Sequence, residues 1–150
     1  MTMNGKDWCN RRIVVGVDGS PSSMTALRWS LRQAKLTGSE VEAVTAWRYP
    51  STYGFSPTMD GASDFEGDAE KILFDALNEV SGEGPGVIIR PSVVEGHPAD
   101  ILVREARGAD LLVVGSRGHG GFAGVLLGSV SQHCVHHAPC SVLVIQGTGS

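Results

Sequence analysis

The residues with the clearest capacity for chemistry lie in a glycine-rich segment near the end of the chain. It runs from Val114 to Ser131 and reads VGSRGHGGFAGVLLGSVS. Glycine permits positive φ angles and lets main-chain N–H groups approach an anion closely. Ser129 and Ser131 add hydroxyl donors, and Arg117 adds a cation. Together these groups favour a polyphosphate site over the alternative, a flexible surface loop of similar composition.

Two widespread phosphate-binding motifs do not account for this segment. A Walker A loop needs Gly-Lys-Ser/Thr at its end, and the only Gly-Lys pair, Gly5–Lys6, lies near the N-terminus. The dinucleotide fingerprint follows the first strand, where this chain has only the turn from Gly16 to Ser20. Asp18 within that turn is a second candidate ligand contact, although it could equally be an ordinary turn residue.

Histidines and cysteines form a third group close to the C-terminus. His133 and His137 are four residues apart and share a helix face, so with Cys140 they could form a zinc site. The favoured interpretation is packing, in which Val130, Cys134 and His137 form the inward stripe of a helix. No second cysteine pair or acidic ligand supports a metal there.

Short apolar runs and helix signals alternate along the chain. Runs typical of buried parallel strands cover residues 12–17, 41–47, 87–94, 110–114 and 141–145. Start signals, stop signals and apolar stripes predict helices from Pro21 to Gly38, Asp68 to Val80, Pro98 to Gly108 and Ser129 to His137. The stretch from Tyr49 to Ser63 has no period and is expected to be a long loop, either a lid or a contact for a partner.

The alternation of strand and helix predicts the fold class. It gives an α/β protein with one open, five-stranded parallel sheet and helices on both faces. A length of 150 residues suits a single domain. We expect that domain to cover residues 12–146, with a flexible N-terminal arm over residues 1–11 and a tail over residues 147–150.

Composition restricts the classes of partner and compartment. The net charge of −4 and the absence of a Lys/Arg run argue against nucleic acid as a partner. No apolar stretch is long enough to span a membrane, and residues 1–10 lack the apolar core of a secretory signal. Three cysteines form no even framework, which favours a reducing cytoplasm.

Three motifs in order resemble the universal stress protein family. The spacing Gly115-x2-Gly118-x9-Gly128-Ser129 is similar to the ATP-binding motif of that family. The start, Val14 to Ser20, resembles its first strand and turn, and residues 137–145 resemble its usual end. The resemblance covers the chain from about Arg12 to about Gln146 and implies the ATP-binding subtype.

This resemblance implies the strand order 3-2-1-4-5 and a ligand at the switch point between strands one and four, where Asp18 and Gly115 end their strands. Around adenine and ribose it implies Gly16, Asp18, Ala46, Val114 and Gly115. Around the phosphates it implies Gly118, Gly128, Ser129, Val130 and Ser131, and Arg117 and Gly121 complete the candidate set. Mg²⁺ is expected with the ATP, because no P-loop lysine neutralises the phosphates.

The functional hypothesis is a stress-response protein that binds ATP as a nucleotide-dependent regulator and is not an enzyme. A weak ATPase or phosphotransferase is the alternative, supported by Arg117 and His119 but lacking a positioned base. A second alternative is a nucleotide-free module that contacts an unknown protein partner. The last strand, Ser141 to Ile145, carries no charge to guard a sheet edge, which together with the resemblance predicts a homodimer through that strand.

Overall fold

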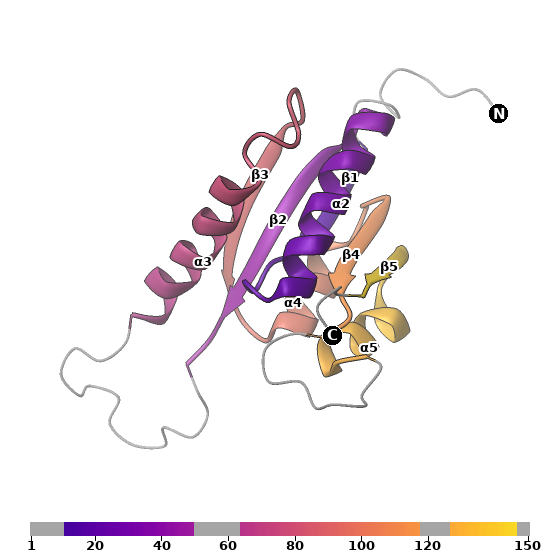
Figure 1. Ribbon diagram of the computed structural model, residues 1–150. Coiled ribbons are helices and arrows are strands. Elements are labelled where there is room, and N and C mark those ends of the chain that lie inside the picture. Colours follow the sequence, from indigo (N-terminus) through magenta and orange to yellow (C-terminus); the bar gives the residue numbers. More distant parts are fainter. Residues whose placement is uncertain (1–10, 50–63, 118–126, 147–150) are drawn as a thin grey trace.

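Strands and helices alternate along the whole described chain (Figure 1). The computed structural model describes residues 11–49, 64–117 and 127–146. The strands are β1 (Arg12–Gly16), β2 (Glu40–Trp47), β3 (Ile89–Glu95), β4 (Leu111–Gly115) and β5 (Ser141–Ile145). The helices are α2 (Pro21–Thr37), α3 (Phe65–Glu79), α4 (Pro98–Glu105) and α5 (Ser129–His137). No described helix has the length and apolar character needed to cross a membrane.

All five strands form one parallel sheet in the order β3-β2-β1-β4-β5. The first strand of the chain therefore lies in the middle, with Val15 opposite Ala43 of β2 and Val113 of β4. The predicted fold class and strand order are confirmed. The alternation of strand and helix signals predicted the fold class, with β1 and β4 as continuous apolar runs, whereas the strand order came from the family resemblance.

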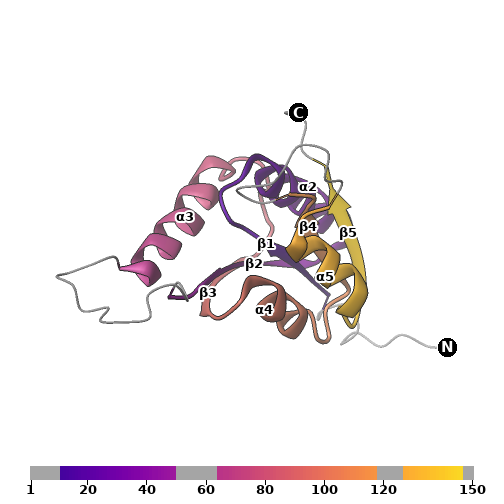
Figure 2. The same ribbon diagram turned by 90° about the horizontal axis from the view of Figure 1, so that it is seen from below.

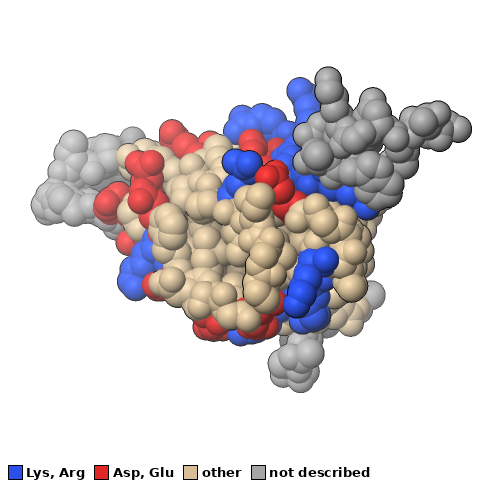
Figure 3. All heavy atoms as spheres, turned by 90° about the horizontal axis from the view of Figure 1, so that it is seen from above, with Lys and Arg blue, Asp and Glu red and all other residues tan. Residues whose placement is uncertain are grey.

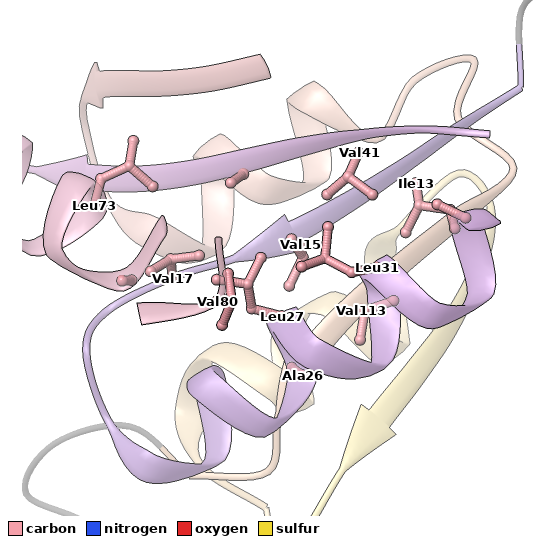
Figure 4. Packing of buried hydrophobic residues seen from close by; sticks show 13 residues of the cluster. Ile13, Val15, Val17, Ala26, Leu27, Leu31, Val41, Leu73, Val80 and Val113 are labelled. Carbon is pink, nitrogen blue, oxygen red and sulfur yellow. The ribbon is translucent and has the colours of Figure 1, made fainter. Parts of the chain in front are cut away.

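The helices cover the sheet in two layers, with α2 and α3 on one face and α4 and α5 on the other (Figure 2). Successive residues of a strand face opposite sides, so Val15 packs under α2 and α3 while Val14 packs under α4 and α5. Leu27 and Leu31 of α2 and Leu73 of α3 are fully buried in the first core (Figure 4). This packing holds the start of each helix near the carboxyl ends of the strands.

Local signals set most helix ends, with two corrections, one of which is that α4 ends at Glu105 and not at the predicted Gly108. The predicted start of α2 is confirmed, because Ser20 accepts a hydrogen bond from the Ser23 N–H and Pro21 follows. Helix α3 begins at Phe65 and not at the predicted Asp68. Its N-cap is Asp64, whose Oδ1 accepts from the Gly67 N–H at 2.9 Å.

A cluster centred on Arg12 ties the chain together at the amino-terminal end of the sheet. Its guanidinium forms an ion pair with Glu42 and donates to the carbonyl oxygens of Glu105 and Arg107, at 3.0 and 2.7 Å. The main-chain N–H of Arg12 donates to a carboxylate oxygen of Asp110 at 3.0 Å. Figure 3 views the molecule from this end and shows acidic and basic side chains around an uncharged area. The candidate site lies at the opposite end of the sheet, where the strands have their carboxyl ends.

Candidate functional site

The chain leaves the two neighbouring central strands, β1 and β4, toward opposite faces of the sheet. Strand β1 leads into α2 on one face, and β4 leads toward α5 on the other (Figure 2). The two strands pair through Val15 and Val113, so their carboxyl ends lie next to each other. An open α/β sheet binds its ligands at this kind of switch point.

The turn after β1 holds Asp18 in a defined position. One carboxylate oxygen of Asp18 accepts from the Ser20 N–H at 2.9 Å and from the Ser20 hydroxyl at 2.5 Å. The Asp18 N–H donates to the Ser23 hydroxyl at 3.3 Å. Gly19 has a φ of 82°, which a residue with a side chain rarely adopts. Asp18 is therefore both a turn residue and half-exposed at the switch point.

The end of β4 comes unusually close to the first turn of α2. A Cβ atom on Gly115 would lie 2.4 Å from the Ser22 hydroxyl oxygen and 2.8 Å from the Ser22 carbonyl carbon. Glycine is required at this position because main-chain atoms block any side chain. Beyond it, the Ser22 hydroxyl donates to the carbonyl oxygen of Arg117 at 2.5 Å. The start of the glycine-rich segment is thus held by α2.

The main chain of Ser116 holds the two described ends of the glycine-rich segment together. Its carbonyl oxygen accepts from the Gly128 N–H at 2.6 Å and from the Ser131 hydroxyl at 2.9 Å. Its N–H donates to the carbonyl oxygen of Ile145 on β5 at 2.8 Å. The residues before and after positions 118–126 therefore start and finish at one place, between β4, β5 and α5.

Helix dipoles favour an anion at this switch point over the other loops at the same end of the sheet. The first turns of α3 and α4 carry acidic residues, namely Glu66, Asp68 and Asp100. Among the described residues, the first turns of α2 and α5 carry none. The N-cap of α5 is Gly128, which has no side chain to cap the helix, and no side-chain cap bond is made there among the described residues. The N-terminus of α5, next to β4, thus keeps its partial positive charge for a ligand, whereas α2 begins beside the Asp18 carboxylate, which accepts from its N-cap Ser20.

The nucleoside candidates lie around the switch point, but several have packing roles. A Cβ on Gly16 would lie 2.9 Å from a methyl carbon of Leu102, so the glycine also makes room for α4. Val114 is 3% exposed and its side chain belongs to the core, which leaves only its main chain for a ligand. Ala46 is partly buried on β2, next to Thr45, whose hydroxyl donates to the carbonyl oxygen of Val17 at 2.8 Å.

The phosphate candidates differ more strongly in accessibility. Arg117 and Ser129 are exposed, and Val130 is partly buried against the second core. Ser131 is 2% exposed and donates its hydroxyl to Ser116, so its first role is structural. Gly118 and Gly121 lie outside the described residues, as does His119.

The sequence analysis did not single out Ser22 or the carbonyl of Ser116. Ser22 gave only a weak signal, as one of three serines around Pro21, and its partner Arg117 is 95 residues away. The Ser116 bonds involve main-chain atoms, which no residue type reveals.

The predicted inward stripe of α5, formed by Val130, Cys134 and His137, is only partly correct. Cys134 is fully buried, as expected, and burial raises the pKa of its thiol to about 11. His137, however, is exposed, and its ring centre lies 4.4 Å from that of His133. His133 Nε2 lies 3.5 Å from Asp100 of α4. No group of three possible ligands within residues 11–49, 64–117 and 127–146 is arranged to hold a metal ion.

Comparison with known proteins identifies the family. The model of the universal stress protein family matches residues 10–146 of this chain. The chain belongs to the universal stress protein family. A universal stress protein of Mycobacterium tuberculosis is 36% identical over 136 residues, which cover 88% of this chain. A second, from Mycolicibacterium smegmatis, is 33% identical over 135 residues and 89% of this chain. The chain spans less than half the length of these relatives, 43% and 45%.

Solved universal stress proteins share the architecture. The UspA protein of Lactobacillus plantarum aligns with a TM-score of 0.75 at 24% identity, over 90% of this chain and 97% of its own. A universal stress protein in complex with cAMP aligns at 0.69 and 30% identity, over 93% and 99%. One from Arabidopsis thaliana with AMP bound aligns at 0.62 and 25% identity, over 93% of each chain. Universal stress proteins similar to this chain therefore bind adenine nucleotides.

Proposed function

We propose that this universal stress protein binds ATP at the carboxyl ends of β1 and β4 and acts as a nucleotide-dependent regulator in the stress response, in the cytoplasm. The observation that supports it most directly is the switch point itself. Two helices with no acidic residue in their first turns begin there, around a glycine-rich segment held at both described ends. The similar proteins solved with cAMP and with AMP support an adenine nucleotide as the ligand.

Each half of the ligand has its own set of residues in this proposal. Asp18, fixed by Ser20 and Ser23, accepts hydrogen bonds from the nucleoside. The main chains of Gly16, Ala46, Val114 and Gly115 line the nucleoside half. The phosphates take main-chain N–H groups at the start of α5, the Ser129 hydroxyl and Arg117, together with Gly118 and Gly121. Mg²⁺ accompanies the triphosphate and offsets its charge.

Calorimetric titration of the purified chain with ATP and Mg²⁺ tests this proposal. We expect saturable heat and a rise in the melting temperature, because a ligand that binds only the folded state stabilises it. AMP, cAMP and adenosine, titrated in parallel, separate the contribution of the phosphates from that of the nucleoside. Absence of heat and of any thermal shift at millimolar ATP would overturn the proposal. Nucleotide released from the purified protein on denaturation provides an independent reading.

We further propose that the chain binds ATP without efficient turnover. Phosphoryl transfer needs a positioned base or water-orienting group beside the phosphates. Among the described polar groups at the switch point, Ser22 and Ser131 donate their hydroxyls to main-chain carbonyls, and the Asp18 carboxylate already accepts from Ser20. Release of inorganic phosphate from saturating ATP should therefore stay close to that of a buffer control. Turnover that follows the protein through purification would favour the ATPase alternative.

Finally, we propose a homodimer that pairs through β5. The two edges of the sheet differ: β3 carries Pro91, Arg90 and Glu95, whereas β5 reads SVLVI and has neither a proline nor a charge. Proline and charge prevent edge strands from pairing with other chains. Strand β5 thus has the edge suited to a second copy of this chain.

A further inference from the structure

The first turn of α2 contacts both halves of the proposed nucleotide site. On one side, Ser20 and Ser23 bond to Asp18 after β1. On the other side, Ser22 donates to the carbonyl oxygen of Arg117 after β4. Three nearly consecutive serines therefore connect the ends of two strands that are about a hundred residues apart in the chain.

Ser22 is placed to hold the main chain and not to contact a ligand. It is 6% exposed, and its hydroxyl donates to the Arg117 carbonyl at 2.5 Å. Gly115 lets the strand approach this closely, because no Cβ fits beside Ser22. The contact therefore depends on two residues from different elements, and it fixes the point where the glycine-rich segment leaves the sheet.

A second contact holds the same stretch from the other face of the sheet. The Ser131 hydroxyl of α5 donates to the carbonyl oxygen of Ser116, next to Arg117. Successive carbonyls, of Ser116 and Arg117, are thus fixed by serines of two different helices. Main-chain N–H groups bind an anion well only when their directions are set in advance, since ordering them on binding costs conformational entropy.

We propose that Ser22 is a positioning residue for the phosphate half of the site. This inference rests on the proposed ATP function. Its hydroxyl fixes the direction of the main chain at Arg117, while the nucleoside half is fixed separately by Ser20 and Ser23. Loss of the Ser22 hydroxyl therefore weakens binding of the phosphates and leaves binding of adenosine unchanged.

The test compares Ser22→Ala with the parent chain by titration with ATP and Mg²⁺ and with adenosine. Loss of one neutral hydrogen bond predicts ATP affinity about 3- to 10-fold lower. Adenosine affinity should stay within twofold. The ratio of the two dissociation constants is the decisive reading, because a general loosening of the fold lowers both affinities together.

Ser30→Ala is the matched control. Ser30 is fully buried in the same helix, and its hydroxyl donates to the carbonyl oxygen of Ala26 at 2.8 Å, within α2. We expect this substitution to lower the melting temperature by an amount similar to Ser22→Ala and to leave the ratio unchanged.

The results separate the inference from the proposal beneath it. If the parent chain binds ATP and Ser22→Ala leaves the ratio unchanged, or lowers both affinities equally, the positioning role is wrong and the ATP site stands. If the parent chain binds adenosine and ATP equally, or neither, the proposed phosphate site fails and the inference fails with it. A melting curve of each variant checks that the chain is folded.

Discussion

At the scale of single residues, the atoms proposed to contact a ligand at the switch point also stabilise the fold. Asp18 shows this most clearly, because one of its carboxylate oxygens already accepts two hydrogen bonds from Ser20. A substitution at Asp18 therefore mixes a structural effect with a binding effect, unless the replacement keeps the acceptor. Asparagine keeps one acceptor oxygen at this position, replaces the other with an NH2 donor and removes the charge.

Asp18→Asn should reduce nucleoside binding with little change in stability. Hydrogen bonds to a charged group contribute about 1.5–3 kcal/mol, so adenosine affinity should fall about 10- to 100-fold. Asp18→Ala should reduce affinity similarly and also lower the free energy of unfolding by about 1 kcal/mol, since Ser20 loses its acceptor. Calorimetry and urea unfolding measure the two effects. Unchanged adenosine affinity in Asp18→Asn would show that the carboxylate is only a turn residue.

The carboxyl group of Glu42, at the opposite end of the sheet, is expected to make stability depend on pH. Burial raises the pKa of Glu42, and the neighbouring Glu105 raises it further, while Arg12 opposes both. The folded chain then binds this proton more tightly than the unfolded chain does. The contribution to stability is full below the ordinary pKa, near 4.5, and is lost as the pH rises through the higher folded value.

Glu42→Gln should remove this contribution. Unfolding free energies measured from pH 4 to 7 should fall less steeply with pH in the variant than in the parent chain. Glu105→Gln provides the control on the cause, because it leaves Glu42 in place and lowers its pKa. Identical slopes for all three proteins would contradict the assignment.

At the scale of elements, α3 packs on β2 and β3 through few fully buried side chains. Its buried residues are Ala69, Leu73 and Ala76, so Leu73 is the only large side chain that it buries completely. Arg28 of α2 adds ion pairs with Glu79 and with Glu83 just beyond α3. These pairs are exposed and contribute little to stability. Leu73 is therefore the largest fully buried contact of α3, and Leu77 and the C-cap Val80 pack in the same core.

Leu73→Ala should cost about 2–5 kcal/mol of unfolding free energy, the usual range for a buried leucine that leaves a cavity. Hydrogen exchange should rise first in α3, ahead of α2. Phe74→Ala is the control: it removes a larger side chain, but Phe74 is 48% exposed, so the cost should stay below about 1 kcal/mol. Equal costs in urea unfolding would argue against Leu73 as the largest buried contact of α3.

Elements were easier to predict from the sequence than the contacts between them. Ser20 and Gly38 mark the ends of α2 by local cap bonds, and Pro21 marks its start by its fixed φ angle. The start of α3 was missed by three residues because Asp64 and Asp68 are both suitable caps, and only packing selects between them. The bond from Ser22 to Arg117 joins residues 95 positions apart, and no local signal encodes it. The sequence therefore predicted the strands and turns that form the candidate site, but not the contacts that hold them together.

At the scale of the whole molecule, the difference between the sheet edges predicts how the chain associates. Ile145 directs its carbonyl toward β4, where it accepts from the Ser116 N–H. Because main-chain groups alternate along a strand, Val144 directs its N–H toward the free edge. That group would bond to a second copy.

Val144→Pro should convert the dimer into a monomer, since proline has no N–H and is tolerated at an edge. Val144→Ala is the control: it shortens the same side chain, keeps the N–H and should leave the dimer intact. Light scattering after size-exclusion chromatography at micromolar concentration measures both. A monomeric parent chain, or a dimeric Val144→Pro, would exclude pairing through β5.

The central place of β1 also has a consequence for biosynthesis. A ribosome makes β1 first, yet one of its two neighbours, β4, follows almost a hundred residues later. Until Leu111–Gly115 emerges, the nascent chain exposes one side of Ile13, Val14 and Val15 as an unpaired, apolar edge. Chaperones that shield such edges during translation should therefore matter most while residues 12–110 emerge, and least once the fourth strand has been released from the exit tunnel.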